Sequence, residues 1–199
     1  MSVPLTYFPA YLGLYVSLVL AVTASAFLDI RYGTFGVEVL IWAVVFLVTL
    51  GVGWRQGGQV TNWGRRWQRW MLGIGAVTSV LIILPGWGLP RGGIYMLAAL
   101  QASYNCVTTG RRQLHLGLLV ATVIVMFAAS HYRADWTMLF YLVPFVIAVV
   151  FTLVAEQINR RVEDLRAQSL GDAGLGGQGV AIVAASAVIL LLAGLLYAA

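Results

Sequence analysis

The sequence predicts an all-α bundle of transmembrane helices, with about seven spans and a short interfacial helix. Of its 199 residues, 61% are hydrophobic and only 10% are charged, against about 25% charged in an average soluble domain. Seven acidic and twelve basic side chains cannot give a compact body of this size a polar surface, so lipid must cover most of it. The apolar runs are continuous and lack the alternation of an outer-membrane strand, which favours helices.

Seven apolar segments are long enough, or nearly so, to cross about 30 Å of hydrocarbon. They are residues 10–28, 35–54, 71–85, 93–109, 114–130, 137–155 and 180–199. The third is short and ends in a Pro- and Gly-rich stretch, so it and the fourth are expected to form a tight hairpin. We therefore expect a six-span bundle over residues 1–170, a Gly-rich linker over 171–179 and a C-terminal transmembrane helix over 180–199.

The distribution of arginine predicts the orientation. Nine of the twelve Arg lie in the alternate segments 55–69, 111–112 and 156–179, whereas the other connections hold only Arg31, Arg91 and Arg133. Because cytoplasmic loops carry the excess of Arg, the first set is placed inside a bacterial inner membrane. The N-terminus is then cytoplasmic and the C-terminus extracytoplasmic. The first nine residues lack the features of a signal peptide, so the first span is expected to remain in the protein.

Several classes of chemistry are excluded by what the sequence lacks. It has no Lys, which rules out a retinal Schiff base, and the single Cys106 rules out an internal disulfide or a multi-thiolate metal site. No nucleophile elbow, Walker loop, Rossmann glycine pattern or His-Glu-x-x-His motif is present. The chain is therefore expected to have no active site, and it requires no metal or cofactor.

A cluster of tryptophan and arginine precedes the third span. It consists of Trp63, Arg65, Arg66, Trp67, Arg69 and Trp70. The three indoles are spaced i, i+4, i+7, which puts them on one helical face at headgroup depth, while the guanidinium groups can meet anionic lipid phosphates. The pattern favours an interfacial anchor helix. A docking face for a protein partner is the alternative, and a nucleic-acid partner is not expected beside a membrane.

The fourth span carries an unusual number of polar side chains in its second half. Gln101, Asn105 and Thr108 fall at i, i+4, i+7, so one polar stripe must face the bundle interior or a hydrated cavity. Hydrogen bonding between helices is one interpretation. A path for a polar substrate or a lipid headgroup is the other.

Two histidines lie at opposite ends of the fifth span. His115 and His131 are about 24 Å apart at 1.5 Å per residue, so they cannot ligate one metal together. Each could bind a separate haem or chlorin. A hydrogen-bonding side chain at the membrane interface is the simpler interpretation of both.

Residues 97–161 carry a family resemblance. A polar helix end leads into Thr109-Gly110-Arg111-Arg112-Gln113-Leu114-His115-Leu116, and a later span closes with Glu156-Gln157-Ile158-Asn159-Arg160-Arg161. This order resembles the N-terminal membrane region of bacterial transglutaminase-like proteins of the TgpA type. The resemblance implies a membrane module whose Cys, His and Asp catalytic centre belongs to an extracytoplasmic domain, so no catalytic role passes to Cys106, His115 or His131. The neutral run 104–107 departs from the family, which commonly has Lys and Glu there.

These observations lead to one expected function and two alternatives. The first is a non-catalytic membrane scaffold or accessory subunit of a larger inner-membrane complex, in contact with the bilayer, its anionic lipids and other membrane subunits. The second is the membrane module of a transglutaminase-like enzyme. The third is a small transporter or lipid-handling protein.

Overall fold

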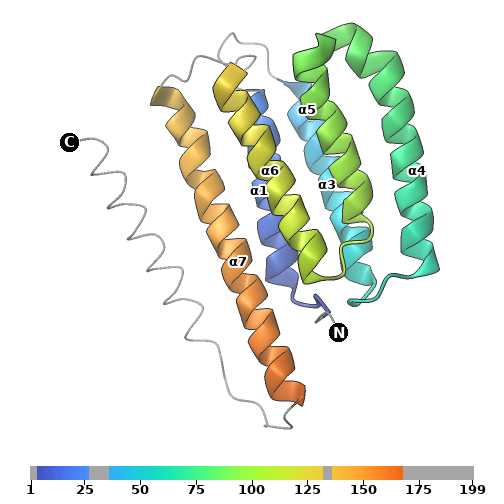
Figure 1. The fold of residues 1–199 in the computed structure, drawn as a ribbon, viewed down its shortest axis with the longest axis vertical. Coiled ribbons are helices and arrows are strands. Elements are labelled where there is room, and N and C mark those ends of the chain that lie inside the picture. Colours follow the sequence, from blue (N-terminus) through green and yellow to red (C-terminus); the bar gives the residue numbers. More distant parts are fainter. Residues whose placement is uncertain (1–3, 27–35, 132–135, 168–199) are drawn as a thin grey trace.

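The computed structural model describes residues 4–26, 36–131 and 136–167, and every long element in them is helical. The helices are α1 (Phe8–Ser25), α3 (Val37–Arg55), α4 (Asn62–Thr78), α5 (Leu84–Asn105), α6 (Arg111–His131) and α7 (Leu139–Ala167). They run alternately in opposite directions and form a bundle (Figure 1). The predicted linker 171–179 and the seventh span 180–199 lie outside the described residues.

Five helical stretches in this described part are long and apolar enough to cross a membrane, as expected for a membrane protein. They are Phe8–Ser25, Val37–Trp54, Asn62–Gly86, Arg111–Ser130 and Leu139–Val162. The predicted number of seven is not confirmed. The helix α5 is not among the five because six of the residues 84–93 are Gly or Pro, which lowers the hydropathy of its first half.

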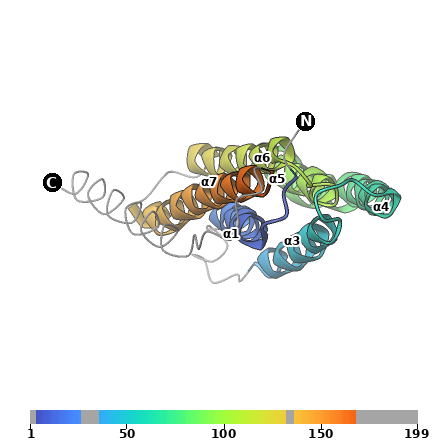
Figure 2. The ribbon, with the colours of Figure 1, turned by 90° about the horizontal axis from the view of Figure 1, so that it is seen from below.

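The centre of the bundle is α1. Ten of its 18 residues are buried, and it packs against α7, α6 and α3. Ala10, Leu14, Leu18 and Ala21 follow the spacing of one helical face and are fully buried. Viewed along the bundle, α1 lies between α7 and α3, whereas α4 is at the far edge (Figure 2).

The hairpin expected from the third and fourth spans is present as α4 and α5, which lie side by side (Figure 1). The chain reverses within the expected stretch 85–90, because Gly92 lies against Ile83 and Gly75 against Ala99. The reversal is made of helical turns, however, and not of an open turn. A π-helical turn, Ser79–Ile83, carries the chain directly into α5, and Pro85 falls in the first turn of that helix. Proline is tolerated there because its missing N–H would have no intrahelical partner.

The separate interfacial helix is also corrected by the structure. Thr61 caps the start of α4, where its Oγ1 accepts a hydrogen bond from Gly64 N at 3.2 Å. The Trp- and Arg-rich residues 63–70 are the first turns of α4, which continues into the apolar residues 71–78. No helix breaker separates the two stretches, so the interfacial sequence and the third predicted span form one helix.

Candidate functional site

The polar features converge on one end of the bundle. The N-terminal segment 4–7, the α3–α4 and α5–α6 connections and the end of α7 all lie there (Figure 1). These elements include the described parts of the Arg-rich segments, which the sequence predicts to lie on one side of the membrane. We call this end, made of residues 4–7, 55–66, 105–115 and 156–162, the basic end.

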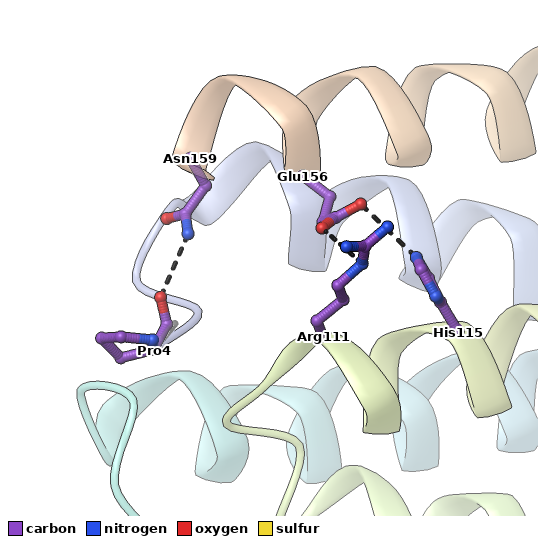
Figure 3. Close-up of polar contacts among 5 residues, drawn as sticks. All are labelled: Pro4, Arg111, His115, Glu156 and Asn159. Carbon is purple, nitrogen blue, oxygen red and sulfur yellow. Dashed lines mark hydrogen bonds and ion pairs between the residues drawn. The ribbon is translucent and has the colours of Figure 1, made fainter. Parts of the chain in front are cut away.

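A buried carboxylate joins α6 to α7 at the basic end. Glu156 has a side chain only 5% exposed, and its Oε1 lies 3.0 Å from Arg111 Nε (Figure 3). His115 Nε2 lies 3.4 Å from Glu156 Oε2, within ion-pair distance for a protonated imidazole but not oriented for a hydrogen bond. Burying a carboxylate is costly unless a cation compensates it, and Arg111 supplies that cation.

A second residue of α7 holds the N-terminal segment. Asn159 Nδ2 donates to Pro4 O at 3.0 Å (Figure 3), and its Oδ1 accepts from Thr6 N at 3.3 Å and Tyr7 N at 3.1 Å. Tyr7 is the N-cap residue of α1 and makes no side-chain cap of its own. The amide of Asn159 therefore satisfies backbone donors at the start of α1 from another helix.

The same segment is also tied to the end of α5. Leu5 N donates to Thr109 O at 2.9 Å, and Pro4 pairs with Gly110 in an isolated antiparallel bridge. The Tyr11 hydroxyl oxygen lies 2.7 Å from Thr108 O and 3.1 Å from Leu5 O, so its proton can be donated to either carbonyl. Periodicity assigned no role to residues 4–7, because such a short irregular segment has no helical or strand pattern.

The side chain of Gln56 forms hydrogen bonds that link the α3–α4 loop to the α5–α6 loop. Its Nε2 donates to Cys106 O and, at 3.3 Å, to Val52 O, while its Oε1 accepts from Thr61 N at 3.0 Å. One side chain thus contacts the end of α5 and the start of α4. Gln56 was not predicted from the sequence, where the only signal was an amide followed by two glycines in a short connection.

The residues of the predicted polar stripe lie inside the bundle. Gln101 and Asn105 are buried in the bundle; Gln101 Nε2 donates to Asn105 Oδ1 at 2.8 Å, and Asn105 Nδ2 lies 3.5 Å from Thr49 Oγ1 of α3. Thr108 is also buried, but it lies beyond the end of α5 at Asn105. Its Oγ1 instead donates to Tyr104 O at 3.2 Å.

The aromatic and basic side chains at the start of α4 point mostly outward. Trp63 is 44% and Trp70 66% exposed, Arg65, Arg66 and Arg69 are exposed, and Trp67 is half-buried. The rings of Trp63 and Trp67 make an edge contact with centroids 6.0 Å apart. Their role at the membrane interface stays a prediction.

The two histidines and the cysteine have different surroundings. His115 faces Glu156, as described, whereas His131 ends α6 and its side chain is not among those described. Cys106 is buried, and its thiol donates to Ala102 O, with 3.7 Å between Sγ and the oxygen. Among the described residues, no three His, Cys, Asp or Glu side chains gather as a metal site would require.

Comparison of the chain with protein-family models, curated proteins and solved structures found no match. Glu156, Asn159 and Gln56 direct their polar atoms at cations or backbone groups of neighbouring segments. This arrangement holds helix ends together at one end of the bundle.

Proposed function

We propose that the chain is a non-catalytic membrane scaffold or accessory subunit of a larger complex in a bacterial inner membrane. The observation that supports this function is the exposure of α4. Gly64 is the one residue of this 17-residue helix that is buried, although its second half is apolar. Leu72, Ile74 and Val77 are between 45% and 57% exposed. A helix held at the edge of a bundle offers its outer face to another transmembrane helix.

The interior of the bundle supports the same function. Gln101 and Asn105 form hydrogen bonds that join α5 internally and to α3, as expected of polar groups that stabilise helix packing in lipid. The third candidate, a transporter, would use them along a path. Since their amide groups already bond one another, we favour the scaffold.

For this function we propose a cytoplasmic N-terminus and an extracytoplasmic C-terminus. The clustering of the Arg-rich connections at the basic end supports this orientation, because such connections remain on the cytoplasmic side. The lipid contacts include anionic headgroups near Arg65, Arg66 and Arg69.

The test is purification of the native protein in a gentle detergent, followed by mass spectrometry of co-purifying subunits and an absorption spectrum. A stoichiometric membrane partner is expected, and Ile74→Trp or Val77→Trp on the outer face of α4 should release it. Leu119→Trp is the matched control, because Leu119 is 58% exposed on α6. Isolation as a lone colourless monomer would contradict the proposal. A Soret or chlorin band in the absorption spectrum would instead indicate that His115 and His131 ligate a haem or chlorin.

A second candidate is the membrane module of a transglutaminase-like enzyme. The specific observation in its favour is the contact between Arg111 and Glu156. These residues belong to the two motifs, 109–116 and 156–161, on which the family resemblance rests. This candidate predicts a catalytic domain outside the cytoplasm, either continuous with this chain or on a co-purifying partner. Mass spectrometry of the native complex distinguishes it, since a scaffold would co-purify with membrane subunits that have no such domain.

A further inference from the structure

A hollow of about 320 Å³ lies between α1 and α7 on the outside of the bundle. Its lining is apolar: Leu12, Gly13, Val16 and Leu20 on α1, and Pro144, Ile147, Ala148, Phe151 and Val154 on α7. We call these nine residues the α1–α7 groove. Gly13 lies where α1 closely approaches α7, since a Cβ there would collide with Thr152. Val16 and Ile147 are 37% and 40% exposed.

The groove is about as long as one leaflet is thick, and it lies in the middle of the apolar stretches Phe8–Ser25 and Leu139–Val162. Pro144 and Val154 mark its ends on α7, ten residues apart, which corresponds to about 15 Å along a helix. The hydrocarbon of a bilayer is about 30 Å thick, so the groove covers about half of it. A transmembrane helix would need a groove of the full thickness, whereas one lipid acyl chain reaches from the headgroup to the middle of the bilayer.

The groove face of α7 leads to a positive charge at the basic end. Ile147, Phe151, Val154, Ile158 and Arg161 follow at i, i+4, i+7, i+11 and i+14, which is the spacing of one helical face. Arg161 is exposed and lies about 10 Å beyond Val154 along the helix, at the depth of the lipid headgroups. A guanidinium group binds phosphate oxygens through paired N–H donors.

We propose that the α1–α7 groove binds one acyl chain of an anionic phospholipid whose phosphate contacts Arg161. The apolar lining accounts for the chain, and the length of the groove favours an acyl chain over a transmembrane helix. Arg161 accounts for the anionic head and for its position at the basic end. This site is independent of the scaffold function, because it lies on α1 and α7 and not on the outer face of α4.

The test uses the full chain in lipid nanodiscs that contain phosphatidylglycerol carrying a photoreactive acyl chain, together with native mass spectrometry. Wild-type protein should retain one such lipid, and the label should map to α1 and α7 near Val16 and Ile147. Val16→Trp and Ile147→Trp, which fill the groove, should abolish retention. Val44→Trp is the matched control, because Val44 is 60% exposed on α3.

Arg161→Gln should weaken retention of phosphatidylglycerol about tenfold, while Arg112→Gln, another exposed arginine at the basic end, should leave it unchanged. Unchanged thermal unfolding of each Trp variant shows that the bundle still folds. Equal retention by the groove variants and the Val44 control would overturn the proposal. So would a wild-type dimer that Val16→Trp dissociates, or a wild-type chain that retains no lipid because residues 180–199 occupy the groove.

Discussion

Arg111 Nε lies 3.0 Å from Glu156 Oε1, and this ion pair ties the first turn of α6 to α7. The two residues are unequal in environment. The Glu156 side chain is 5% exposed, whereas that of Arg111 is 47% exposed. Arg111 can therefore turn to water when its partner is removed, but Glu156 cannot.

This asymmetry predicts different effects of the two neutral substitutions. Arg111→Gln should lower the free energy of unfolding by about 2 kcal/mol, because it leaves a buried carboxylate with only His115 nearby. Glu156→Gln should cost less than about 1 kcal/mol, because the freed Arg111 is solvated. Thermal unfolding in detergent measures both, with Arg112→Gln as the control. A larger loss for Glu156→Gln than for Arg111→Gln would contradict the burial of the carboxylate.

Asn159 should fix the N-terminal segment. Asn159→Ala removes the bonds to Pro4 O, Thr6 N and Tyr7 N, and it should cost about 2 kcal/mol. The amides of Thr6 and Tyr7 should also exchange hydrogen faster. Hydrogen exchange followed by mass spectrometry measures this directly.

Asn159→Asp refines the same experiment, because it keeps the acceptors for Thr6 N and Tyr7 N but loses the donor to Pro4 O. Its exchange rates should lie between those of the wild type and Asn159→Ala. The control is Gln157→Ala, two residues away and exposed. Unchanged exchange in Asn159→Ala would show that the segment is held by its other contacts alone.

Two glycines of α3 should respond in opposite ways to alanine. A Cβ at Gly53 would come within 2.5 Å of the backbone oxygen of Asn105, so Gly53→Ala must push α3 away from α5. We expect it to cost about 2 kcal/mol. A Cβ at Gly51 meets nothing within 4 Å, so Gly51→Ala should stabilise the helix by up to about 1 kcal/mol. Thermal unfolding of the pair tests the α3–α5 contact, and equal effects would count against it.

Gln101→Leu and Asn105→Leu should reduce assembly. Each removes a member of the pair bonded at 2.8 Å and leaves the other buried amide without that partner. The loss of stability expected per hydrogen bond in a membrane is about 0.6 kcal/mol. Asn105→Leu should lose more stability than Gln101→Leu, because it also removes the hydrogen bond to Thr49. The yield of folded protein on size-exclusion chromatography measures assembly. A variant that assembles fully but loses transport of a solute would support the transporter instead.

How well the sequence predicted each helix depends on whether the signal was a long apolar run or a short pattern of Pro, Gly or polar residues. The apolar runs predicted both ends of α1, α3 and α6 and the start of α7 to within a few residues, because lipid requires long continuous hydrophobic helices. The end of α7 lies well beyond the apolar run. Pro and Gly correctly indicated where the chain reverses between α4 and α5. They did not predict that the reversal is helical, with a π-helical turn before it and Pro85 in the first turn of α5. In the polar stripe, Gln101, Asn105 and Thr108 are all buried, but the helical spacing holds only as far as Asn105, where α5 ends.

The sequence by itself determined a membrane protein of apolar helices with its arginines in alternate connections, because composition and hydropathy are local properties of the chain. Only the tertiary structure decided which polar groups meet. Pro4 and Asn159 are separated by 155 residues, and Arg111 and Glu156 belong to different helices, so no spacing rule relates them. Their contacts arise because alternating helices return distant segments to the same end of the bundle, where buried polar groups must find one another.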